Sequence, residues 1–114
     1  IQVEKIKLLH VLINLIKNAS EAMSNTYSED RYLNLGIDHI GDLIQITVSD
    51  NGHGISESNM ERLFERGFTT KDEGHGFGLN SSKNYVNEMG GTIKAESLGT
   101  GKGAKFIVQF SVPK

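Results

Sequence analysis

The sequence of 114 residues contains no cysteine, no tryptophan and a single proline. Without cysteine, the chain can form no disulfide, no thiolate metal site and no cysteine nucleophile. It has no apolar run of the roughly 18 residues that a membrane-spanning helix needs, and no signal-peptide pattern. Its net charge of −2 lacks the basic excess typical of nucleic-acid-binding proteins, so we expect no nucleic-acid partner.

The length is that of one domain, which we expect over residues 1–114. The chain does not begin with methionine, and it starts in a charged, periodic segment. We therefore expect a fragment of a longer protein, and a fragment that makes no membrane contact of its own.

Glycine is abundant, with 13 residues in the chain, against a usual share of about 7%. All but two of them fall between Gly52 and Gly103, in small clusters. Such clusters indicate tight turns or a backbone that comes close to a phosphate group.

Apolar residues that recur every three or four positions predict a long helix over residues 2–25. These residues are Val3, Ile6, Leu9, Leu12, Ile13, Ile16, Ala19 and Met23. We expect a helix of this composition to be mostly buried. Ser56 has the position of an N-cap for a short helix that ends near Gly67. A third helix is expected to begin at about Phe77 and to end at the glycine pair 90–91.

Alternating apolar and polar residues predict strands over residues 33–38 and 43–50, and a closing hairpin over residues 92–98 and 105–112. Helices and strands therefore do not alternate strictly along the chain. This order favours an α+β fold, a two-layer α/β sandwich with a mixed, mostly antiparallel sheet and helices packed on one face.

Four polar residues, separated by four, four and three positions, form a stripe on one face of the first helix. They are His10, Asn14, Asn18 and Glu21. An unsatisfied buried amide costs about 1–3 kcal/mol, so on a buried helix such a stripe is either paired or lines a cavity. A solvated helix face is the alternative interpretation.

The segment after the second expected strand combines an acidic residue with two glycines, in the pattern Asp50-x-Gly52-x-Gly54. A carboxylate at the end of a strand can accept a hydrogen bond from an exocyclic amine, and the glycines let a flat ligand approach the backbone. An ordinary strand-to-helix turn, with Asp50 as a local acceptor, is the alternative.

A further glycine cluster precedes the third helix, at Gly74, Gly76 and Gly78. Free N–H groups at the start of a helix attract anions, and Lys71 could add a positive charge. The spacing is similar to a dinucleotide-binding fingerprint, but no strand immediately precedes it, and the Walker A lysine is missing. A glycine loop without a ligand is the alternative.

Together, these motifs resemble those of the catalytic and ATP-binding domain of sensor histidine kinases, in the GHKL superfamily with its Bergerat ATP-binding fold. The N box corresponds to LINLIKNASEA (residues 12–22) and the G1 box to DNGHGI (50–55). The F box corresponds to FERGFTTK (64–71) and the G2 box to GHGFGL (74–79). The family's closing glycine turn is similar to GKGAKF (101–106). The five motifs occur in the family's order and span almost the whole chain.

The resemblance implies a site for ATP and Mg²⁺. Asn18 would bind the Mg²⁺ that bridges the phosphates, a role that suits an amide oxygen, and Asp50 would accept a hydrogen bond from the adenine N6 amine. Residues 67–78 would form the ATP lid, with Phe64 and Phe68 at its base. The implied nucleotide-binding residues are Asn14, Asn18, Asp50, Gly52, Gly54, Ile55, Phe68, Lys71, Gly74, His75, Gly76, Phe77, Gly78 and Leu79.

Asn14 bears on the type of reaction. In hydrolases that share this fold, a glutamate four residues before the metal-binding asparagine activates water. An amide cannot act as a general base, so the resemblance implies a phosphotransferase, a protein histidine kinase, in place of an ATPase. The closing turn departs from the family pattern, because Ala104 and Lys105 stand where many relatives have threonine.

The resemblance places the phosphoacceptor outside this chain. The histidines present are His10, His39, His53 and His75, and none lies in a run that resembles a phosphoacceptor motif. The implied partners are a separate dimerisation domain, which carries the histidine, and a response regulator. The implied location is the cytoplasm, in a kinase that is often membrane-anchored. We therefore expect the fragment to bind ATP but not to phosphorylate itself.

Two alternatives remain open. One is a related protein-serine kinase of the anti-sigma type with the same ATP site. The other is a degenerate domain that scaffolds partners without nucleotide. The presence of Asn18, Asp50, Gly76 and Gly78 argues against the scaffold.

Overall fold

The computed structural model describes residues 5–23, 32–52, 54–65, 78–99 and 102–111. Three helices lie within these ranges, namely α1 (Lys5–Ala22), α2 (Glu57–Arg62) and α3 (Gly78–Glu88). Four strands accompany them, namely β1 (Leu33–Ile40), β2 (Leu43–Asp50), β3 (Thr92–Glu96) and β4 (Ala104–Ser111). The element order is the one that the sequence predicts.

The boundaries differ from the predicted ones by a few residues. The long helix ends at Ala22, and Met23 follows in a turn. Strand β1 runs two residues further than expected, to Ile40, because the hairpin turn needs only Gly41 and Asp42. Strand β3 stops at Glu96, since the residues after it form the turn that leads into β4.

The four strands form one sheet in the order β1-β2-β4-β3, and its three pairings are all antiparallel. This agrees with the expected mostly antiparallel sheet. In the register of the two central strands, Asp50 is opposite Ala104 and Val48 is opposite Phe106. Residues 46, 48 and 50 of β2 therefore point to one face of the sheet, and the alternate residues point to the other.

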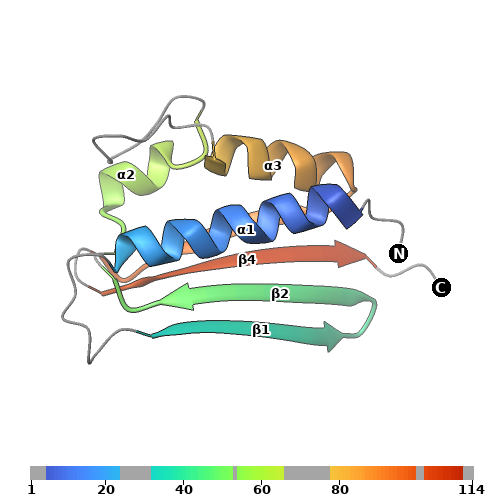
Figure 1. Cartoon of the computed structure of the whole chain (residues 1–114), viewed down its shortest axis with the longest axis horizontal. Helices are drawn as coiled ribbons and strands as arrows, with labels where there is room; N and C mark the ends of the chain where they lie inside the picture. Colours follow the sequence, from blue (N-terminus) through green and yellow to red (C-terminus); the bar gives the residue numbers. More distant parts are fainter. Residues whose placement is uncertain (1–4, 24–31, 53, 66–77, 100–101, 112–114) are drawn as a thin grey trace.

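The helices pack on one face of the sheet (Figure 1). Lys7 near the start of α1 contacts Glu88 at the end of α3, with 2.8 Å between Nζ and Oε2. Asn14 further along α1 contacts Ser82, nearer the start of α3. The two helices are therefore antiparallel neighbours. In the part of the chain that the structure describes, no helix is both long enough and apolar enough to cross a membrane.

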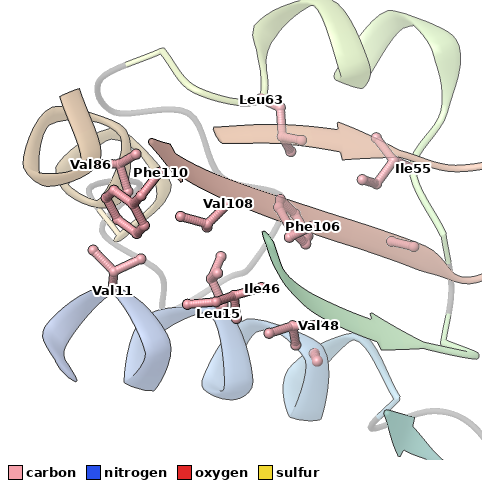
Figure 2. Packing of buried hydrophobic residues seen from close by; sticks show 12 residues of the cluster. Val11, Leu15, Ile46, Val48, Ile55, Leu63, Val86, Phe106, Val108 and Phe110 are labelled. Carbon is pink, nitrogen blue, oxygen red and sulfur yellow. The ribbon is translucent and has the colours of Figure 1, made fainter. Parts of the chain in front are cut away.

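The core lies between α1, α3 and the sheet (Figure 2). Helix α1 contributes Val11, Leu15 and Ala19, which are spaced four residues apart and are almost fully buried. Phe106 is the largest of the fully buried side chains and lies on the central strand β4. Burial of such side chains stabilises the fold by about 1.5–3 kcal/mol each.

The expectation that α1 is mostly buried is wrong. Four of its large apolar residues are exposed, with exposed fractions from 38% at Ile16 to 77% at Ile6. The others are Leu9 and Ile13. The helix is apolar on two adjacent stripes, and the three-to-four spacing by itself does not say which stripe meets the sheet. The packing of α1 against α3 and β2 selects the stripe of Val11.

Apolar residues of the edge strand β1 are exposed as well. Leu33, Leu35 and Ile37 of β1 pair with Asp50, Val48 and Ile46, so they point to the helix-covered face. They are nevertheless exposed, as is typical of a sheet whose edge extends beyond its helix layer.

Helix ends follow the local signals in the sequence. The Ser56 side chain accepts a hydrogen bond from the Asn59 amide, which confirms the predicted N-cap of α2. Helix α3 ends with two bonds, from the Gly91 amide to the Val86 carbonyl and from the Gly90 amide to the Asn87 carbonyl. Gly90 has a φ of +79°, so this is the Schellman arrangement for which glycine is preferred.

Candidate functional site

Asp50 is the last residue of β2 and is only 5% exposed. Its Oδ1 atom accepts a hydrogen bond from the Gly52 amide at 2.8 Å, and its Oδ2 atom is buried as well. The backbone bond is the local turn contact that an aspartate at this position commonly makes. It fixes the orientation of the carboxylate, whose side chain points to the helix-covered face together with Val48.

Two glycine turns meet beside Asp50. Gly54 has a φ of +75°, and a Cβ atom there would overlap the carbonyl oxygen of Gly99. Gly103 has a φ of +73°, and a Cβ atom there would overlap the carbonyl oxygen of Asp50. The Gly103 amide also donates to the Gly52 carbonyl at 3.2 Å. The two turns are therefore in backbone contact, which only glycine permits at these two positions.

The polar stripe of α1 faces helix α3, which two of its residues contact. Asn14 is half-buried, and its Nδ2 atom donates to Ser82 Oγ at 3.4 Å. Asn18 and Glu21, one and two turns further along, are half-buried. His10 is exposed, and its ring meets the Tyr85 ring edge-on with 5.1 Å between the centroids. The stripe is thus partly paired across the helix interface, as buried polar groups must be, and is solvated at His10.

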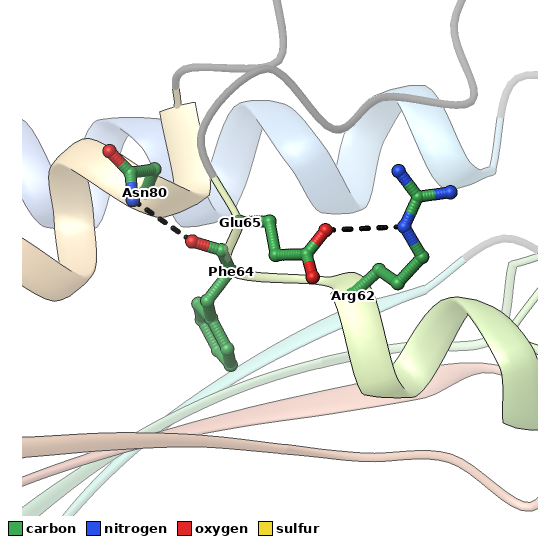
Figure 3. Close-up of polar contacts among 4 residues, drawn as sticks. All are labelled: Arg62, Phe64, Glu65 and Asn80. Carbon is green, nitrogen blue, oxygen red and sulfur yellow. Dashed lines mark hydrogen bonds and ion pairs between the residues drawn. The ribbon is translucent and has the colours of Figure 1, made fainter.

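The segment after α2 is tied to the first turn of α3 (Figure 3). Asn80 Nδ2 donates to the Phe64 carbonyl at 3.0 Å, and Arg62 pairs with Glu65 at 3.2 Å. The Phe64 ring packs edge-on against Phe106 of the core, with 6.4 Å between the centroids. These contacts join the described residues on either side of positions 66–77, which lie outside the described residues.

Several predicted nucleotide-binding residues lie outside the described ranges. They are Phe68, Lys71, Gly74, His75, Gly76 and Phe77. The histidines His53 and His75 are also outside. Gly78 begins α3, and the Leu79 side chain packs against the core. Ile55 is buried in the same core cluster.

Asn18 and Asp50 lie toward the same end of the molecule. Figure 1 is oriented with the long axis horizontal, and the C-terminal ends of α1 and β2 both lie at its left. Asn18 is in the last turns of α1, and Asp50 ends β2. Two motifs that are 32 positions apart in the sequence thus approach the same end of the fold.

Two residues that contact the candidate residues have no counterpart among the predicted site residues. Ser82 of α3 is fully buried and contacts Asn14. Ser97, directly after β3, makes hydrogen bonds to both glycine turns. A small polar residue on the inner face of α3 is a signal that could have identified Ser82. The position of Ser97 depends on long-range packing, and its neighbours in the sequence do not indicate it.

Residues 3–114 match the sequence model of the family described as histidine kinase-, DNA gyrase B-, and HSP90-like ATPase. The chain belongs to this family. The ATPase-family domain is 37% identical over 101 residues to a probable C4-dicarboxylate sensor kinase of Bacillus subtilis. The aligned segment covers 88% of this chain and 19% of that protein.

Solved structures agree with this assignment. The catalytic domain of histidine kinase ThkA, in a nucleotide-free form, superimposes with a TM-score of 0.82 at 28% identity, over 97% of this chain and 70% of that one. Full-length ShkA in complex with AMPPNP gives a TM-score of 0.78 at 25% identity, over 94% of this chain and 22% of that one. The expected family and α+β fold are therefore confirmed. This chain spans about a fifth of the length of the curated relatives it matches.

Proposed function

We propose that this chain is the ATP-binding catalytic domain of a two-component sensor histidine kinase. In this proposal it binds Mg-ATP, and the γ-phosphoryl group is transferred to a histidine on a separate dimerisation domain. The observation that carries the proposal is Asp50, a carboxylate that is buried, oriented by the Gly52 amide, and bordered by two glycine turns. Membership of the ATPase family and the sensor-kinase relatives support it.

The donor set suits adenine. A carboxylate can only accept hydrogen bonds when ionised, and the exocyclic N6 group of adenine offers N–H donors. Because one oxygen of Asp50 is already used by the Gly52 amide, the carboxylate cannot rotate without losing that bond. A fixed acceptor of this kind distinguishes adenine from a base that carries a carbonyl at the same ring position.

The proposed Mg²⁺ ligand is Asn18. Among the residues whose positions the structure gives, no group of three histidine, cysteine or acidic side chains could hold a metal ion by itself. In the proposed complex, a divalent ion next to Asn18 would also bind phosphate oxygens and water, the ligands that Mg²⁺ usually keeps in nucleotide sites. When bound, the ion would neutralise phosphate charge during transfer.

Asn14 supports transfer to a protein acceptor over hydrolysis. The side chain at this position is an amide whose nitrogen donates to Ser82. It therefore has no basic group with which to activate water. The lid formed by residues 67–78, the histidine-bearing dimerisation domain, the response regulator and a cytoplasmic location are further parts of the proposal that rest on the resemblance.

Calorimetric titration with ATP and Mg²⁺ tests the proposal, with Asp50→Asn as the decisive variant. Asparagine keeps an acceptor for the Gly52 amide, so the turn is retained, but its NH₂ group meets the adenine amine as donor against donor. We expect the affinity for ATP to fall about tenfold or more, because a hydrogen bond to a charged group contributes about 1.5–3 kcal/mol. The affinity for purine riboside triphosphate, which lacks the amine, should change little.

Asp38→Asn is the matched control, because Asp38 is exposed on the edge strand β1. It should bind ATP as the unsubstituted chain does. No heat at millimolar ATP would instead support a nucleotide-free scaffold, and equal affinity of Asp50→Asn and the unsubstituted chain would refute the assigned base site. Stable radiolabel from ATP on this chain alone, lost when one of its histidines is replaced, would contradict the separate phosphoacceptor.

A further inference from the structure

The hydroxyl of Ser97 connects three backbone segments. Its Oγ atom donates to the Gly103 carbonyl at 2.6 Å and accepts from the Ile55 amide at 3.0 Å and the Gly99 amide at 3.2 Å. A second carbonyl, that of Gly99, is farther away at 3.3 Å, so the proton points to Gly103. A hydroxyl has one donor hydrogen and two acceptor lone pairs. The hydrogen-bonding capacity of Ser97 is therefore fully used.

These bonds join segments that are distant in the sequence. Ile55 belongs to the turn after β2, which is 42 positions before Ser97. Gly99 and Gly103 belong to the turn between β3 and β4. The side chain of Ser97 thus holds the two glycine turns against each other, at the place where a Cβ atom on Gly54 would overlap Gly99.

The same turn supports the backbone of Asp50. The β2–β4 ladder ends at the pair Asp50 and Ala104. Beyond that pair, the Gly103 amide donates to the Gly52 carbonyl, and Gly103 lies against the Asp50 carbonyl oxygen. Because Ser97 fixes the Gly103 carbonyl and Gly52 orients the Asp50 carboxylate, a continuous path of short contacts leads from the hydroxyl to the carboxylate.

We infer that Ser97 is a positioning residue for nucleobase recognition, which acts on Asp50 through the two glycine turns. This inference rests on the proposed function. Without the hydroxyl, the Ile55 and Gly99 amides lose an acceptor and the Gly103 carbonyl loses a donor. The turn that follows Asp50 is then less constrained, and the carboxylate spends less time in the orientation that meets the amine of the base. Contacts to the phosphates, which involve other segments in the proposed site, are unaffected.

The test compares Ser97→Ala with Ser97→Thr, which keeps the hydroxyl, and with Ser111→Ala on an exposed position at the end of β4. Amide hydrogen exchange at Ile55 and Gly52 is measured first, and calorimetry with ATP and with purine riboside triphosphate follows, at a temperature where every variant is fully folded. For Ser97→Ala we expect faster exchange at both amides and an ATP affinity about fivefold to tenfold lower, the loss that corresponds to one hydrogen bond.

The ratio of the affinities for ATP and for purine riboside triphosphate tests the inference. It should fall in Ser97→Ala, return in Ser97→Thr, and stay unchanged in Ser111→Ala. A merely structural role would lower the stability of Ser97→Ala toward urea but leave the selectivity of the folded protein intact, and that result would overturn the inference. Unchanged exchange at Ile55 would overturn it as well. If the unsubstituted chain binds no ATP, the proposed function fails and this inference fails with it. If the unsubstituted chain binds ATP and Ser97→Ala binds equally, only this inference fails.

Discussion

Substitution of Gly54 by alanine gives a sharp test of the contact between the two glycine turns. Gly54 has a φ of +75°, and its missing Cβ atom would overlap the Gly99 carbonyl oxygen. Gly90 is a matched control, because its φ is +79° and an added Cβ would have nothing within 4 Å. The two substitutions therefore introduce the same backbone strain, but only Gly54→Ala introduces an overlap.

The expected losses of stability follow from these geometries. A left-handed backbone conformation costs a non-glycine residue about 1–2 kcal/mol, which is the whole effect expected for Gly90→Ala. In Gly54→Ala the overlapping atom belongs to the backbone, so the two turns must separate. Separation breaks the bond from the Ile55 amide to Ser97, at a further cost of about 1–3 kcal/mol. We therefore expect a total loss of about 2–5 kcal/mol for Gly54→Ala, a large part of the 5–15 kcal/mol typical of a domain.

Urea unfolding followed by circular dichroism measures both losses, and calorimetry with ATP measures the effect on the site. Gly54→Ala should lose more stability and more nucleotide affinity than Gly90→Ala, since Gly90 follows α3 at the opposite end of the molecule from Asp50 (Figure 1). Equal unfolding free energies for the two variants would refute the close contact between the turns. Unchanged ATP binding in a destabilised Gly54→Ala variant would refute the link between that contact and the site.

Two further predictions concern stability alone. Leu15→Ala should lower the free energy of unfolding by about 2–5 kcal/mol because Leu15 is fully buried. Ile13→Ala, at a position that is 54% exposed, should lower it by under about 1 kcal/mol. Similar unfolding free energies of the two variants in urea would contradict the assignment of the Leu15 stripe to the core. Ser56→Ala should lower the free energy of unfolding by about 1 kcal/mol through loss of the N-cap of α2. Ser111→Ala, at an exposed position, is the control. Equal thermal unfolding midpoints for the two variants would contradict a stabilising role of the Ser56 cap.

Local chemistry in the sequence determined the secondary structure and the motifs. The alternation at Ile46 and Val48 is a property of a strand with one buried face, and Ser56 and Gly90 carry their cap signals in their own side chains or in the lack of one. The pattern of Asp50 and its glycines likewise needs only neighbouring residues. These features could be predicted because each depends on positions within a few residues of one another.

Tertiary structure alone decided which face of α1 is buried and how the site is braced. Val11 and Ile13 are both large β-branched residues on the same helix, yet one is fully buried and the other is mostly exposed. The difference arises from where α3 and β2 pack, which is not encoded in the spacing of α1 itself. Ser97 acquires its role in the same way, because its partner Ile55 comes close only when β2 and β4 pair and bring their two turns together.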